Sequence, residues 1–381
     1  MTKLNFGMVG GAEGSFIGEA HRMGAQMNNM AVMVCGCFSR DMNKNFANGS
    51  VWGIDKDRVY PNYWTMAKEE SQRFDGIDFV VIATPNNTHY EIAKCFLEYN
   101  IHVSCDKPVA LKLKEVNELE EITARRNLKF GVSFTYVNYP MVHQLRNMVD
   151  NGDIGNVKMV MAEYPQDWVA NAIDRGENLS KNWHFIQDCA GESAVTADIG
   201  VHLSCLIEMS TGIPIKKVLS RFSNYPNGLA LETNTEVLFE LDGGIPGMLW
   251  ASQIALGYEC GVLIRVFGDK GSLEWNHTIP TKLKYTRVNG PESYLNCGTD
   301  YLYEYPRKMS RLAPGHPEGF FEAFGNYYYA FCLEIVKSKT KESAPTLVYP
   351  TIKEGKSSMK FTKACIESNN AGNVWINIDD M

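Results

Sequence analysis

The sequence predicts an α/β fold: a doubly wound parallel sheet in the first third, then an α+β region with a large, mostly antiparallel, open sheet. Three observations predict this fold. Strand-like and helix-like segments alternate through residues 4–134, which indicates βαβ units. The apolar run over residues 78–83 is typical of a strand covered on both faces. Later strands, such as residues 235–241, alternate apolar and polar side chains, which indicates an antiparallel sheet with helices on one face.

The expected elements follow the chain in that order. In the first region we expect strands at residues 4–9, 31–38, 78–83, 101–105 and 128–134, with helices ending near residue 27 and spanning 90–98 and 113–126. In the second we expect strands at residues 157–164, 235–241, 247–255, 260–268 and 271–275, the last three as a meander that turns at Gly257 and at residues 269–271. We therefore expect a first domain of residues 1–134 and a second of residues 135–381.

The composition is that of an ordinary globular protein, with 45% hydrophobic and 21% charged residues. A net charge of −7 and the lack of a basic cluster argue against nucleic acid or an anionic membrane as partner. We expect no secretory leader, because the first residues lack a charged segment followed by an apolar one, and no apolar run approaches the roughly 18 residues that span a bilayer. We therefore expect a cytoplasmic protein.

The ten cysteines are scattered, and only Cys35 and Cys37 lie close together. Neither a C-x-x-C pair nor a metal-ligand spacing occurs. We expect these cysteines to be reduced and mostly buried, and we expect no metal site.

A glycine-rich turn over residues 7–18 follows the first strand and opens a helix, which is the context of a dinucleotide fingerprint. Small residues there let the backbone approach a pyrophosphate, which the helix N-terminus stabilises. The turn departs from G-x-G-x-x-G, because Ala12 and Ser15 occupy the second and third glycine positions. An ordinary strand–turn–helix is the alternative. The residues expected at the cofactor are Gly10, Gly11, Ala12, Gly14, Ser15, Phe16 and Ile17.

The end of the second strand leaves the choice between NAD and NADP open. An acid there would bind the ribose 2′-hydroxyl of NAD. The chain instead has Ser39 and Arg40, which suit a 2′-phosphate, followed by Asp41, which could serve a ribose.

Lys107 follows a strand-like stretch, and ligands collect outside the carboxyl ends of strands in such sheets. Pro108 fixes its own φ and restricts Lys107 to extended backbone geometry. The backbone therefore limits the direction in which the lysine side chain points. A surface lysine before an ordinary turn is the alternative interpretation.

Asp198 and His202 stand four residues apart at the start of a helix-like segment that ends near Gly212, with Pro214 just beyond. This spacing places both side chains on one helix face. An aspartate there can orient a histidine ring and raise its basicity. The alternatives are helix capping for Asp198 and a satisfied core position for His202.

Several motifs resemble those of the Gfo/Idh/MocA oxidoreductase family, which includes glucose–fructose oxidoreductase and inositol dehydrogenases. They are the glycine turn, Ala83–His89, Cys105–Pro108, Asp198–His202, Arg265–Trp275 and Gly315–Phe320. Their order and spacing carry the resemblance, which covers essentially the whole chain. Asp106 stands where the family usually has glutamate, a variant associated with the branch that oxidises the 3-hydroxyl of glucosides, levoglucosan or inositols.

The resemblance implies an N-terminal Rossmann domain, with NAD(H) favoured over NADP(H), and hydride transfer between this cofactor and a secondary hydroxyl, expected at C3, of a sugar, glycoside or inositol. Such chemistry needs a base for the hydroxyl proton and stabilisation of the alkoxide. We expect His202 to be the base, Asp198 to orient it or hold the sugar, and Lys107 to hydrogen-bond the reacting oxygen as the nucleotide domain's contribution. The family also implies homo-oligomers through the open face of the second sheet and, often, a cis Lys107–Pro108 peptide.

Other residues receive roles from the same resemblance. Those expected at the cofactor are Thr84, Pro85, Asn86, His89 and Asp106, although Asn86 and His89 could equally form a turn and a helix cap. Those expected at the sugar are Tyr136, Tyr164, Trp168, Trp183, His184 and His316. The alternative for both tryptophans is a place in the core, and for His316 it is a loop cap. His184 stands where many members of the branch have arginine.

Two other functions stay open. Some relatives use bound NAD transiently to hydrolyse a glycosidic bond through a 3-keto intermediate, and a non-catalytic sensor shares the fold. Retention of Lys107, Asp198 and His202 argues against the sensor. Accumulation of a ketosugar would indicate the dehydrogenase, whereas a released aglycone without net NADH would indicate the hydrolase.

Overall fold

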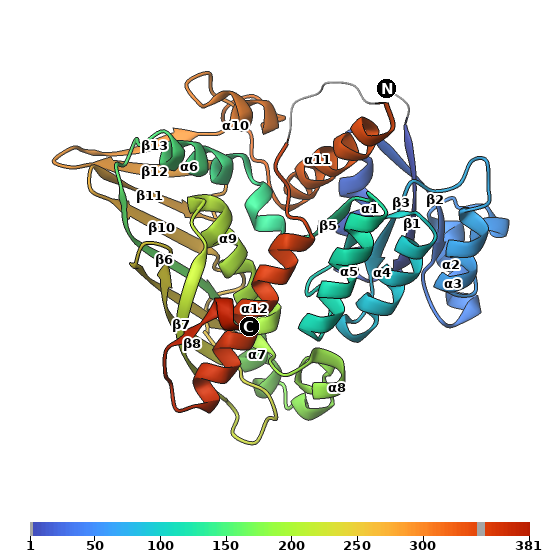
Figure 1. Cartoon of the computed structure of the whole chain (residues 1–381), viewed down its shortest axis with the longest axis horizontal. Coiled ribbons are helices and arrows are strands. Elements are labelled where there is room, and N and C mark those ends of the chain that lie inside the picture. Colours follow the sequence, from blue (N-terminus) through green and yellow to red (C-terminus); the bar gives the residue numbers. More distant parts are fainter. Residues whose placement is uncertain (1–2, 341–346) are drawn as a thin grey trace. The chain divides into compact units, whose positions relative to one another are not determined.

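The computed structural model describes residues 3–340 and 347–381 of the chain. The chain forms two compact units, one of Met1–Thr135 with Phe320–Lys356 and one of Tyr136–Gly319 with Ser357–Met381 (Figure 1). The first unit contains a five-stranded sheet and the second a nine-stranded sheet.

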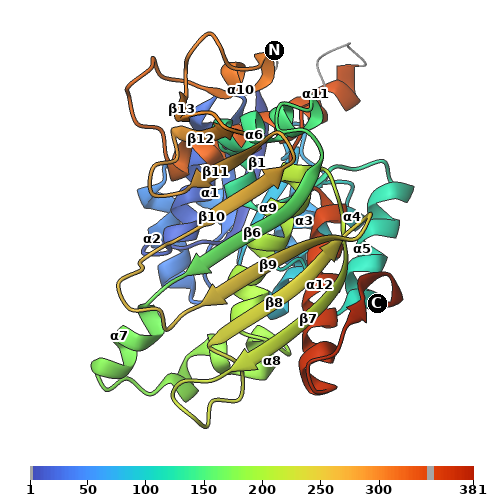
Figure 2. The same cartoon turned by 90° about the vertical axis from the view of Figure 1, so that its left-hand side faces the viewer.

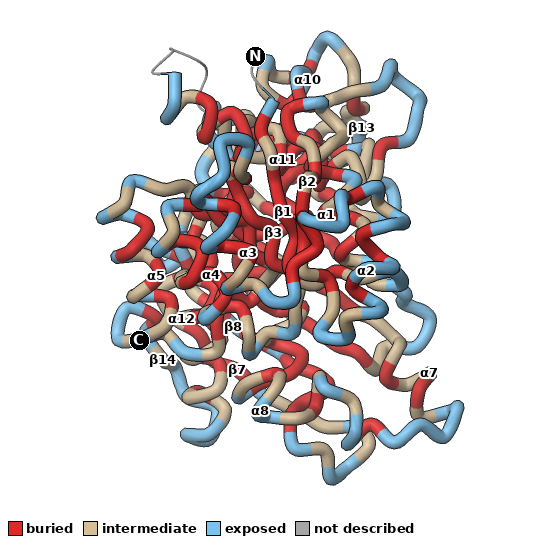
Figure 3. The backbone as a smooth tube through the Cα atoms, turned by 90° about the vertical axis from the view of Figure 1, so that its right-hand side faces the viewer, coloured by how far each residue is buried: buried red, intermediate tan, exposed pale blue. Residues whose placement is uncertain are grey.

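The first unit is built on a parallel sheet in the order β2-β1-β3-β4-β5. Its strands are β1 (Leu4–Gly10), β2 (Ala31–Cys37), β3 (Phe79–Ala83), β4 (His102–Cys105) and β5 (Phe130–Val132). Its connecting helices are α1 (Phe16–Met27), α2 (Met42–Val51), α3 (Tyr63–Glu70), α4 (His89–Glu98) and α5 (Leu113–Arg125). The doubly wound parallel sheet predicted from the sequence is confirmed, and its central strands β1 and β3 are buried (Figure 3).

Helix α11 (Phe320–Thr340) belongs to the first unit, whereas the sequence predicts a second domain that takes in all of residues 135–381. The aromatic side chains of α11 account for this difference. Phe331 packs edge-on against Phe79 of β3, with the ring centroids 5.3 Å apart. The aromatic residues of α11 that are at most 1% exposed are Phe324, Tyr327, Tyr328 and Phe331.

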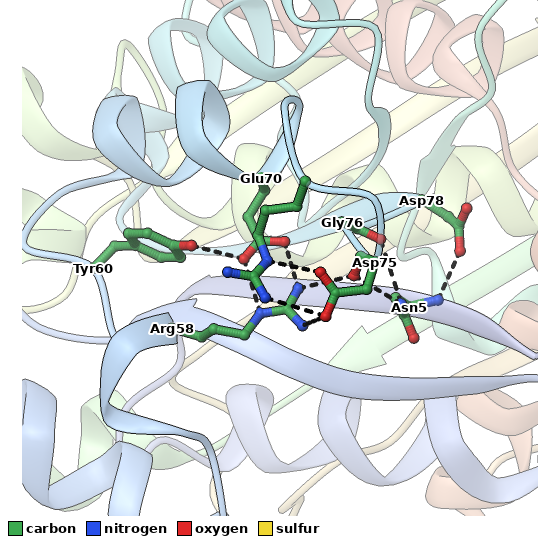
Figure 4. Close-up of polar contacts among 8 residues, drawn as sticks. Asn5, Arg58, Tyr60, Glu70, Asp75, Gly76 and Asp78 are labelled. Atoms are coloured by element: carbon green, nitrogen blue, oxygen red, sulfur yellow. Dashed lines mark hydrogen bonds and ion pairs between the residues drawn. The ribbon is translucent and has the colours of Figure 1, made fainter.

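A buried ion pair holds the segment between β2 and β3 (Figure 4). Arg58 donates from Nε and Nη2 to the two carboxylate oxygens of Glu70, at 3.0 and 2.5 Å, and the Tyr60 hydroxyl donates to the same carboxylate at 2.8 Å. Arg58 also donates to the Asp75 carbonyl oxygen at 3.2 Å. The network therefore ties the short 3-10 helix Lys56–Arg58 to α3 and to the turn before β3.

The second unit is built on a sheet in the order β13-β12-β11-β10-β6-β9-β8-β7-β14. Its strands are β6 (Val157–Pro165), β7 (Ile215–Ser223), β8 (Asn234–Leu241), β9 (Ile245–Ser252), β10 (Leu263–Gly268), β11 (Gly271–Asn276), β12 (Lys282–Arg287), β13 (Glu292–Asn296) and β14 (Ile376–Asn377). Neighbouring strands run antiparallel except β6 and β9, which are parallel. The large, mostly antiparallel sheet is therefore confirmed.

The meander expected through residues 247–275 is wrong in one connection. Strands β10 and β11 form a hairpin, but β9 is not next to β10, because β6 lies between them. Strand β9 pairs with β8 on one edge and with β6 on the other, so it has no free edge for β10. Gly257 consequently lies in a crossover loop rather than in a hairpin turn.

Helices cover one face of the second sheet. Helices α6 (Pro140–Asp150), α9 (Val201–Thr211) and the second-unit part of α12 (Ile352–Asn370) lie against that face. Within residues 3–340 and 347–381, no helix lies over the opposite face (Figure 2). The Ser220 hydroxyl of β7 donates to the Cys365 carbonyl of α12 at 2.5 Å. The remaining helices of this unit are α7 (Trp168–Asp174), α8 (Gln187–Ala190) and α10 (Glu304–Met309).

Among residues 3–340 and 347–381, no helix combines the length and the apolar composition required to cross a bilayer. All ten cysteines fall within this part of the chain, and none forms a disulfide. The same residues contain no group of three or more histidine, cysteine, aspartate or glutamate side chains placed to hold a metal ion.

Candidate functional site

The glycine turn joins β1 to α1 in the first unit. Gly10 and Gly11 have φ values of 79° and 66°, in the left-handed region that favours glycine. Gly11 N donates to the Ala83 carbonyl oxygen at 3.0 Å, which fixes the turn to the end of β3. Ser15 caps α1, and its hydroxyl accepts a hydrogen bond from Gly18 N at 3.2 Å. The turn thus ends at a helix N-terminus, which is an arrangement that binds phosphate groups.

Gly18 was not among the residues expected at the cofactor, yet the turn depends on it. A Cβ atom on Gly18 would lie 2.3 Å from the Gly11 carbonyl oxygen and 2.4 Å from the Gly11 Cα. A Cβ atom on Gly10 would lie 2.3 Å from the Ala83 carbonyl oxygen. Glycines are therefore required where α1, β1 and β3 approach one another. These bare backbones fit the close contact that a dinucleotide pyrophosphate makes with its binding turn.

Asp41, four residues after the end of β2, caps helix α2. Its Oδ1 accepts hydrogen bonds from Asn43 N at 2.9 Å and from Lys44 N at 3.2 Å. The Ser39 hydroxyl accepts from Asp41 N at 3.2 Å, and Arg40 is exposed. One carboxylate oxygen of Asp41 is therefore held by backbone.

His89 is fully buried and links the turns that follow β3 and β4. Its Nδ1 lies 2.7 Å from the Pro108 carbonyl oxygen, and its Nε2 lies 2.8 Å from the Thr84 carbonyl oxygen. Both ring nitrogens of His89 thus lie within hydrogen-bonding distance of backbone carbonyl oxygens, so the side chain fixes the two turns relative to each other. Asn86, preceded by Pro85, begins a short 3-10 helix.

Asp106 fixes the backbone of Lys107. Its Oδ1 accepts hydrogen bonds from Lys107 N at 2.8 Å and from the Ser133 hydroxyl at 2.7 Å. Burial alone would raise the pKa of Asp106, but the charges of His21 and Lys107 and the Ser133 hydrogen bond outweigh it and hold that pKa below its usual value. The Lys107–Pro108 peptide is cis. Lys107 is half-buried, so it is not a fully exposed surface lysine.

Asp198 lies in a π-helical turn, Thr196–Gly200, that leads directly into α9, where the sequence predicts a regular helix. Such turns often occur at functional positions. Because Asp198 lies inside the helical segment, it does not cap it. Its Oδ2 instead accepts a hydrogen bond from Gln253 Nε2 at 2.9 Å. Helix α9 ends at Gly212, whose φ is 73°, as the sequence predicts.

Glu232, just before β8, anchors the start of this segment. Its carboxylate accepts hydrogen bonds from the Ser193 hydroxyl at 2.5 Å, Ala194 N at 3.1 Å and Thr196 N at 3.0 Å. Glu232 is 3% exposed, and burial raises its pKa even though these hydrogen bonds act in the opposite direction. The carboxylate that accepts hydrogen bonds from the first N–H groups of the segment thus comes from the loop before β8.

The His202 ring packs against two buried tyrosines. Its centroid lies 5.1 Å from that of Tyr136, with the ring planes at 80°, and 6.3 Å from that of Tyr164. The two tyrosine hydroxyls are 2.6 Å apart, and Cys260 Sγ lies 3.4 and 3.5 Å from them. His277 hydrogen-bonds Cys260, and the centroid of its ring lies 5.1 Å from that of Tyr136. Tyr136 therefore packs against two imidazole rings.

Burial raises the pKa of both Tyr136 and Tyr164 well above the usual value, so their hydroxyls stay protonated near neutral pH. Burial also acts to raise the pKa of Cys260, but hydrogen bonds from His277 and the two tyrosines outweigh it and lower that pKa. An imidazole can gain and lose a proton near neutral pH. His202, one of the two imidazoles that pack against Tyr136, is therefore a candidate for the general base.

Trp168, Trp183 and His184 form an aromatic stack in the second unit. The His184 ring centroid lies 3.7 Å from that of Trp183 and 5.3 Å from that of Trp168. Trp183 is 40% exposed, while Trp168 packs beside Phe185 on a small apolar cluster. A core position is therefore excluded for Trp183 and holds in part for Trp168.

His316 is exposed, and its Nδ1 lies 3.1 Å from the Ala313 carbonyl oxygen of its own loop. This contact matches the loop-capping alternative. Glu318 closes the same loop by accepting hydrogen bonds from Arg311 N at 2.7 Å and Leu312 N at 2.9 Å.

The second unit thus brings Tyr136, Tyr164, Asp198 and His202 together near the carboxyl ends of the parallel strands β6 and β9. The first unit holds Lys107 and the residues expected at the cofactor.

The residues that sequence analysis missed are Gly18, Glu232, Gln253 and Cys260. Gly18 belongs to the glycine turn and could have been found from it. Gln253 and Glu232 carry no local signal, since Gln253 bonds a residue 55 positions away and Glu232 bonds one 38 positions away.

The chain matches two family models. Residues 4–134 match an oxidoreductase family with an NAD-binding Rossmann fold, and residues 142–274 match the Gfo/Idh/MocA C-terminal domain. The first unit is therefore an NAD-binding domain, and the geometry of its glycine turn fits that cofactor.

Two curated relatives extend this match. The chain is 34% identical over 380 residues to the uncharacterized oxidoreductase YfiI of Bacillus subtilis, covering 98% of this chain and 96% of the relative. It is 24% identical over 265 residues to levoglucosan dehydrogenase of Pseudarthrobacter phenanthrenivorans, covering 64% of each protein. The likeness to the first extends over nearly the full length of both chains.

Solved structures agree. An inositol dehydrogenase homolog from Azotobacter vinelandii in complex with NAD+ has a TM-score of 0.94 at 33% identity, covering 99% of this chain and 97% of that chain. Its complex with NADH and myo-inositol has a TM-score of 0.92 at 32% identity, covering 99% and 98%. Levoglucosan dehydrogenase with NADH and levoglucosan shares the fold, with a TM-score of 0.84 at 21% identity and 99% coverage of both chains. On these matches, the chain belongs to the Gfo/Idh/MocA family of NAD-binding oxidoreductases.

Proposed function

We propose that the protein is a dehydrogenase that oxidises a secondary hydroxyl, at C3, of a sugar, a glycoside or an inositol, with NAD+ as the hydride acceptor. The observation that carries this proposal is the packing of His202 against two tyrosines whose hydroxyls stay protonated. We assign the proton of the substrate hydroxyl to His202, the imidazole that stands four residues after Asp198 on the same helical segment. A positioned base of this kind accelerates such a step by about 100- to 10,000-fold.

Each of the other two residues has a separate role in this proposal. Asp198 is held by Gln253 and orients the His202 imidazole or binds a substrate hydroxyl. The Lys107 ammonium, whose backbone is fixed by Asp106, hydrogen-bonds the reacting oxygen and stabilises the alkoxide as its proton leaves. Bound NAD+ supplies the hydride acceptor.

The substrate class rests on two kinds of support. A structural relative that is 32% identical was solved with NADH and myo-inositol, which is a ring of secondary alcohols. In this chain, the stack of Trp168, His184 and Trp183 offers aromatic faces and an imidazole, which suit the C–H faces and hydroxyls of such a ring. We assign this stack, with Tyr136 and Tyr164, to substrate binding.

The test is a panel of myo-inositol, glucose, levoglucosan and aryl glucosides incubated with the enzyme and NAD+. We expect NADH to form with at least one of them, together with a keto product that NMR places at C3. Release of an aglycone without net NADH would instead identify a glycosidase. Binding of NADH without turnover of any compound would identify a sensor.

We further propose that two copies associate through the face of the second sheet that carries no helix. Leu238 and Met248, on the neighbouring strands β8 and β9, are 43% and 44% exposed on that face. Arg221, Glu236 and Arg265 lie beside them, so the surface presents apolar contacts together with both signs of charge. Such a surface can pair with a second copy of itself about a twofold axis.

Light scattering with size-exclusion chromatography tests this association. The wild-type protein should have a mass in solution at least twice that of a single chain, and Leu238→Glu should reduce that mass. Leu256→Glu is the matched control, because Leu256 is 71% exposed in the loop after β9. A monomeric wild-type protein, or an equal effect of both variants, would contradict the proposal.

A cytoplasmic location completes the proposal. Its support is that ten cysteines occur without a disulfide, which suits a reducing compartment. Fractionation of the native cells should recover the protein in the cytoplasmic extract, and recovery in a secreted fraction would contradict this assignment.

A further inference from the structure

Gln253 is a fully buried amide whose side chain meets a candidate catalytic carboxylate. It directly follows β9 and is 0% exposed. Its Nε2 donates to Asp198 Oδ2 at 2.9 Å. Asp198 itself lies in the π-helical turn before α9, so the hydrogen bond joins two segments that are 55 residues apart in sequence.

The backbone of Gln253 is held on both sides. Its N–H donates to the Thr233 carbonyl oxygen at 3.0 Å, and its own carbonyl oxygen accepts from Val169 N at 3.0 Å. The neighbouring Glu232 anchors the start of the segment that carries Asp198. Because both ends of the connection are fixed, the amide can hold the carboxylate in a single orientation.

The side-chain oxygen of Gln253 indicates that packing alone does not account for a glutamine at this buried position. Among the residues that the structure describes, none hydrogen-bonds the buried Oε1 of Gln253. A buried polar atom without a partner destabilises a fold, so an apolar side chain of equal size would suit this position better if stability alone mattered. The hydrogen bond to Asp198 is what the glutamine adds.

We infer that Gln253 is a positioning residue, which holds the Asp198 carboxylate in the orientation that it needs to act with His202. This inference rests on the proposed function of Asp198 and His202 and adds to it a residue that does not itself touch the reacting atoms. The donated hydrogen bond also favours the ionised form of the carboxylate over the protonated form.

The decisive variant is Gln253→Leu, which keeps the size of the side chain and removes the donor. We expect kcat/KM for the polyol substrate to fall by about 100-fold, the loss that a small misplacement of a catalytic group causes. The loss should appear in kcat, with KM for NAD+ unchanged. Gln144→Leu is the matched control, because Gln144 is also buried in the second unit and its Oε1 accepts a hydrogen bond from the Tyr303 backbone N–H at 3.0 Å.

Two further variants guard against a folding defect. Gln253→Asn keeps an amide but shortens its reach, and we expect a similar loss of kcat with an unchanged melting temperature. Gln253→Glu places a second carboxyl beside Asp198, and we expect the acid limb of the kcat/KM profile to move up by about one pH unit. Wild-type kinetics and an unmoved pH profile in all three variants would overturn the inference.

A second measurement does not depend on turnover. In protein labelled with ¹³C at the aspartate carboxyl carbons, the Asp198 signal, assigned with Asp198→Asn, should titrate about one pH unit higher in Gln253→Leu than in wild type. Equal titration midpoints would overturn the inference even if no substrate is found. Absence of wild-type turnover on every polyol, with a shifted Asp198 titration, would instead contradict the proposed function and leave the role of Gln253 standing.

Discussion

The hydroxyl oxygens of Tyr136 and Tyr164 lie 2.6 Å apart, and each side chain belongs to a residue that is only 4% exposed. Their rings also pack against His202. Since burial raises the pKa of both phenols well above the usual value, the pair can donate hydrogen bonds but cannot act as a base at neutral pH. The two tyrosine rings therefore form the packing surface for the imidazole of His202, the proposed base.

Tyr136→Phe removes one member of this pair and keeps the ring that contacts His202. We expect kcat to fall by about tenfold, because one buried hydrogen bond of about 1 kcal/mol no longer orders Tyr164 and Cys260. NADH binding, measured by its fluorescence, should not change. Tyr139→Phe is the control, since its hydroxyl bonds His277 but not Tyr164. An equal loss in both variants would show that the pair has no special role.

Gly18→Ala tests the close approach inside the glycine turn. The new Cβ atom would lie 2.3 Å from the Gly11 carbonyl oxygen, so the turn must shift. We expect the Kd for NADH to rise at least about tenfold, equivalent to roughly 1.4 kcal/mol. Gly200→Ala, whose Cβ atom would come no closer than 3.3 Å to its neighbours, at a Thr196 methyl group, should leave NADH binding unchanged. Tight binding by Gly18→Ala would contradict this account of the turn.

Buried histidines make the fold sensitive to acid. Burial lowers the pKa of His143 from 6.5 to about 4, and burial does the same for His21 and His102. Below pH 6.5 the unfolded chain takes up protons that the folded chain does not, so stability is full above 6.5 and is lost as the pH falls towards about 4. At neutral pH these rings are uncharged in both states, and by about pH 4 each such group has cost the fold on the order of 3 kcal/mol of stability.

His143→Phe should therefore reduce the loss of stability between pH 7 and pH 5 in urea unfolding. His316→Phe is the control, because His316 is exposed. The prediction fails if the two variants show the same dependence on pH.

The buried pair of Arg58 and Glu70 should stabilise the first unit only when both partners are present. Arg58→Met leaves a carboxylate that is 2% exposed without its cation, and we expect the free energy of unfolding to fall by about 3–5 kcal/mol. The double variant Arg58→Met/Glu70→Leu should lose much less than the sum of the two single variants. Urea denaturation measures all three, and additive losses would contradict a coupled pair.

The sequence predicted the fold wherever a pattern is local. Continuous apolar strands and the glycine turn marked the first sheet, and alternation over residues 235–241 marked the second. The parallel pairing of β6 with β9 could not be predicted, because it depends on which edges remain free once β8 has paired. The position of α11 in the first unit likewise depends on aromatic contacts with distant strands.

The candidate site divides in the same way. Asp198 and His202 are only four residues apart in sequence, so their spacing was enough to predict that both side chains lie on one helix face. The residues that hold them do not share this advantage: Gln253 follows another strand, and Glu232 precedes one. The π-helical turn at Asp198 was also missed, since the sequence offers no periodicity that separates it from a regular helix over five residues.

The most direct test of the central claim compares wild type, His202→Asn and Lys107→Met on the substrate that the panel identifies. Under the proposed mechanism, both variants bind NADH with wild-type affinity while kcat falls by about 100-fold or more, and the pH dependence of kcat that belongs to the base disappears in His202→Asn. Near-normal turnover with an unchanged pH profile in His202→Asn would show that another group takes the hydroxyl proton, and would contradict the account.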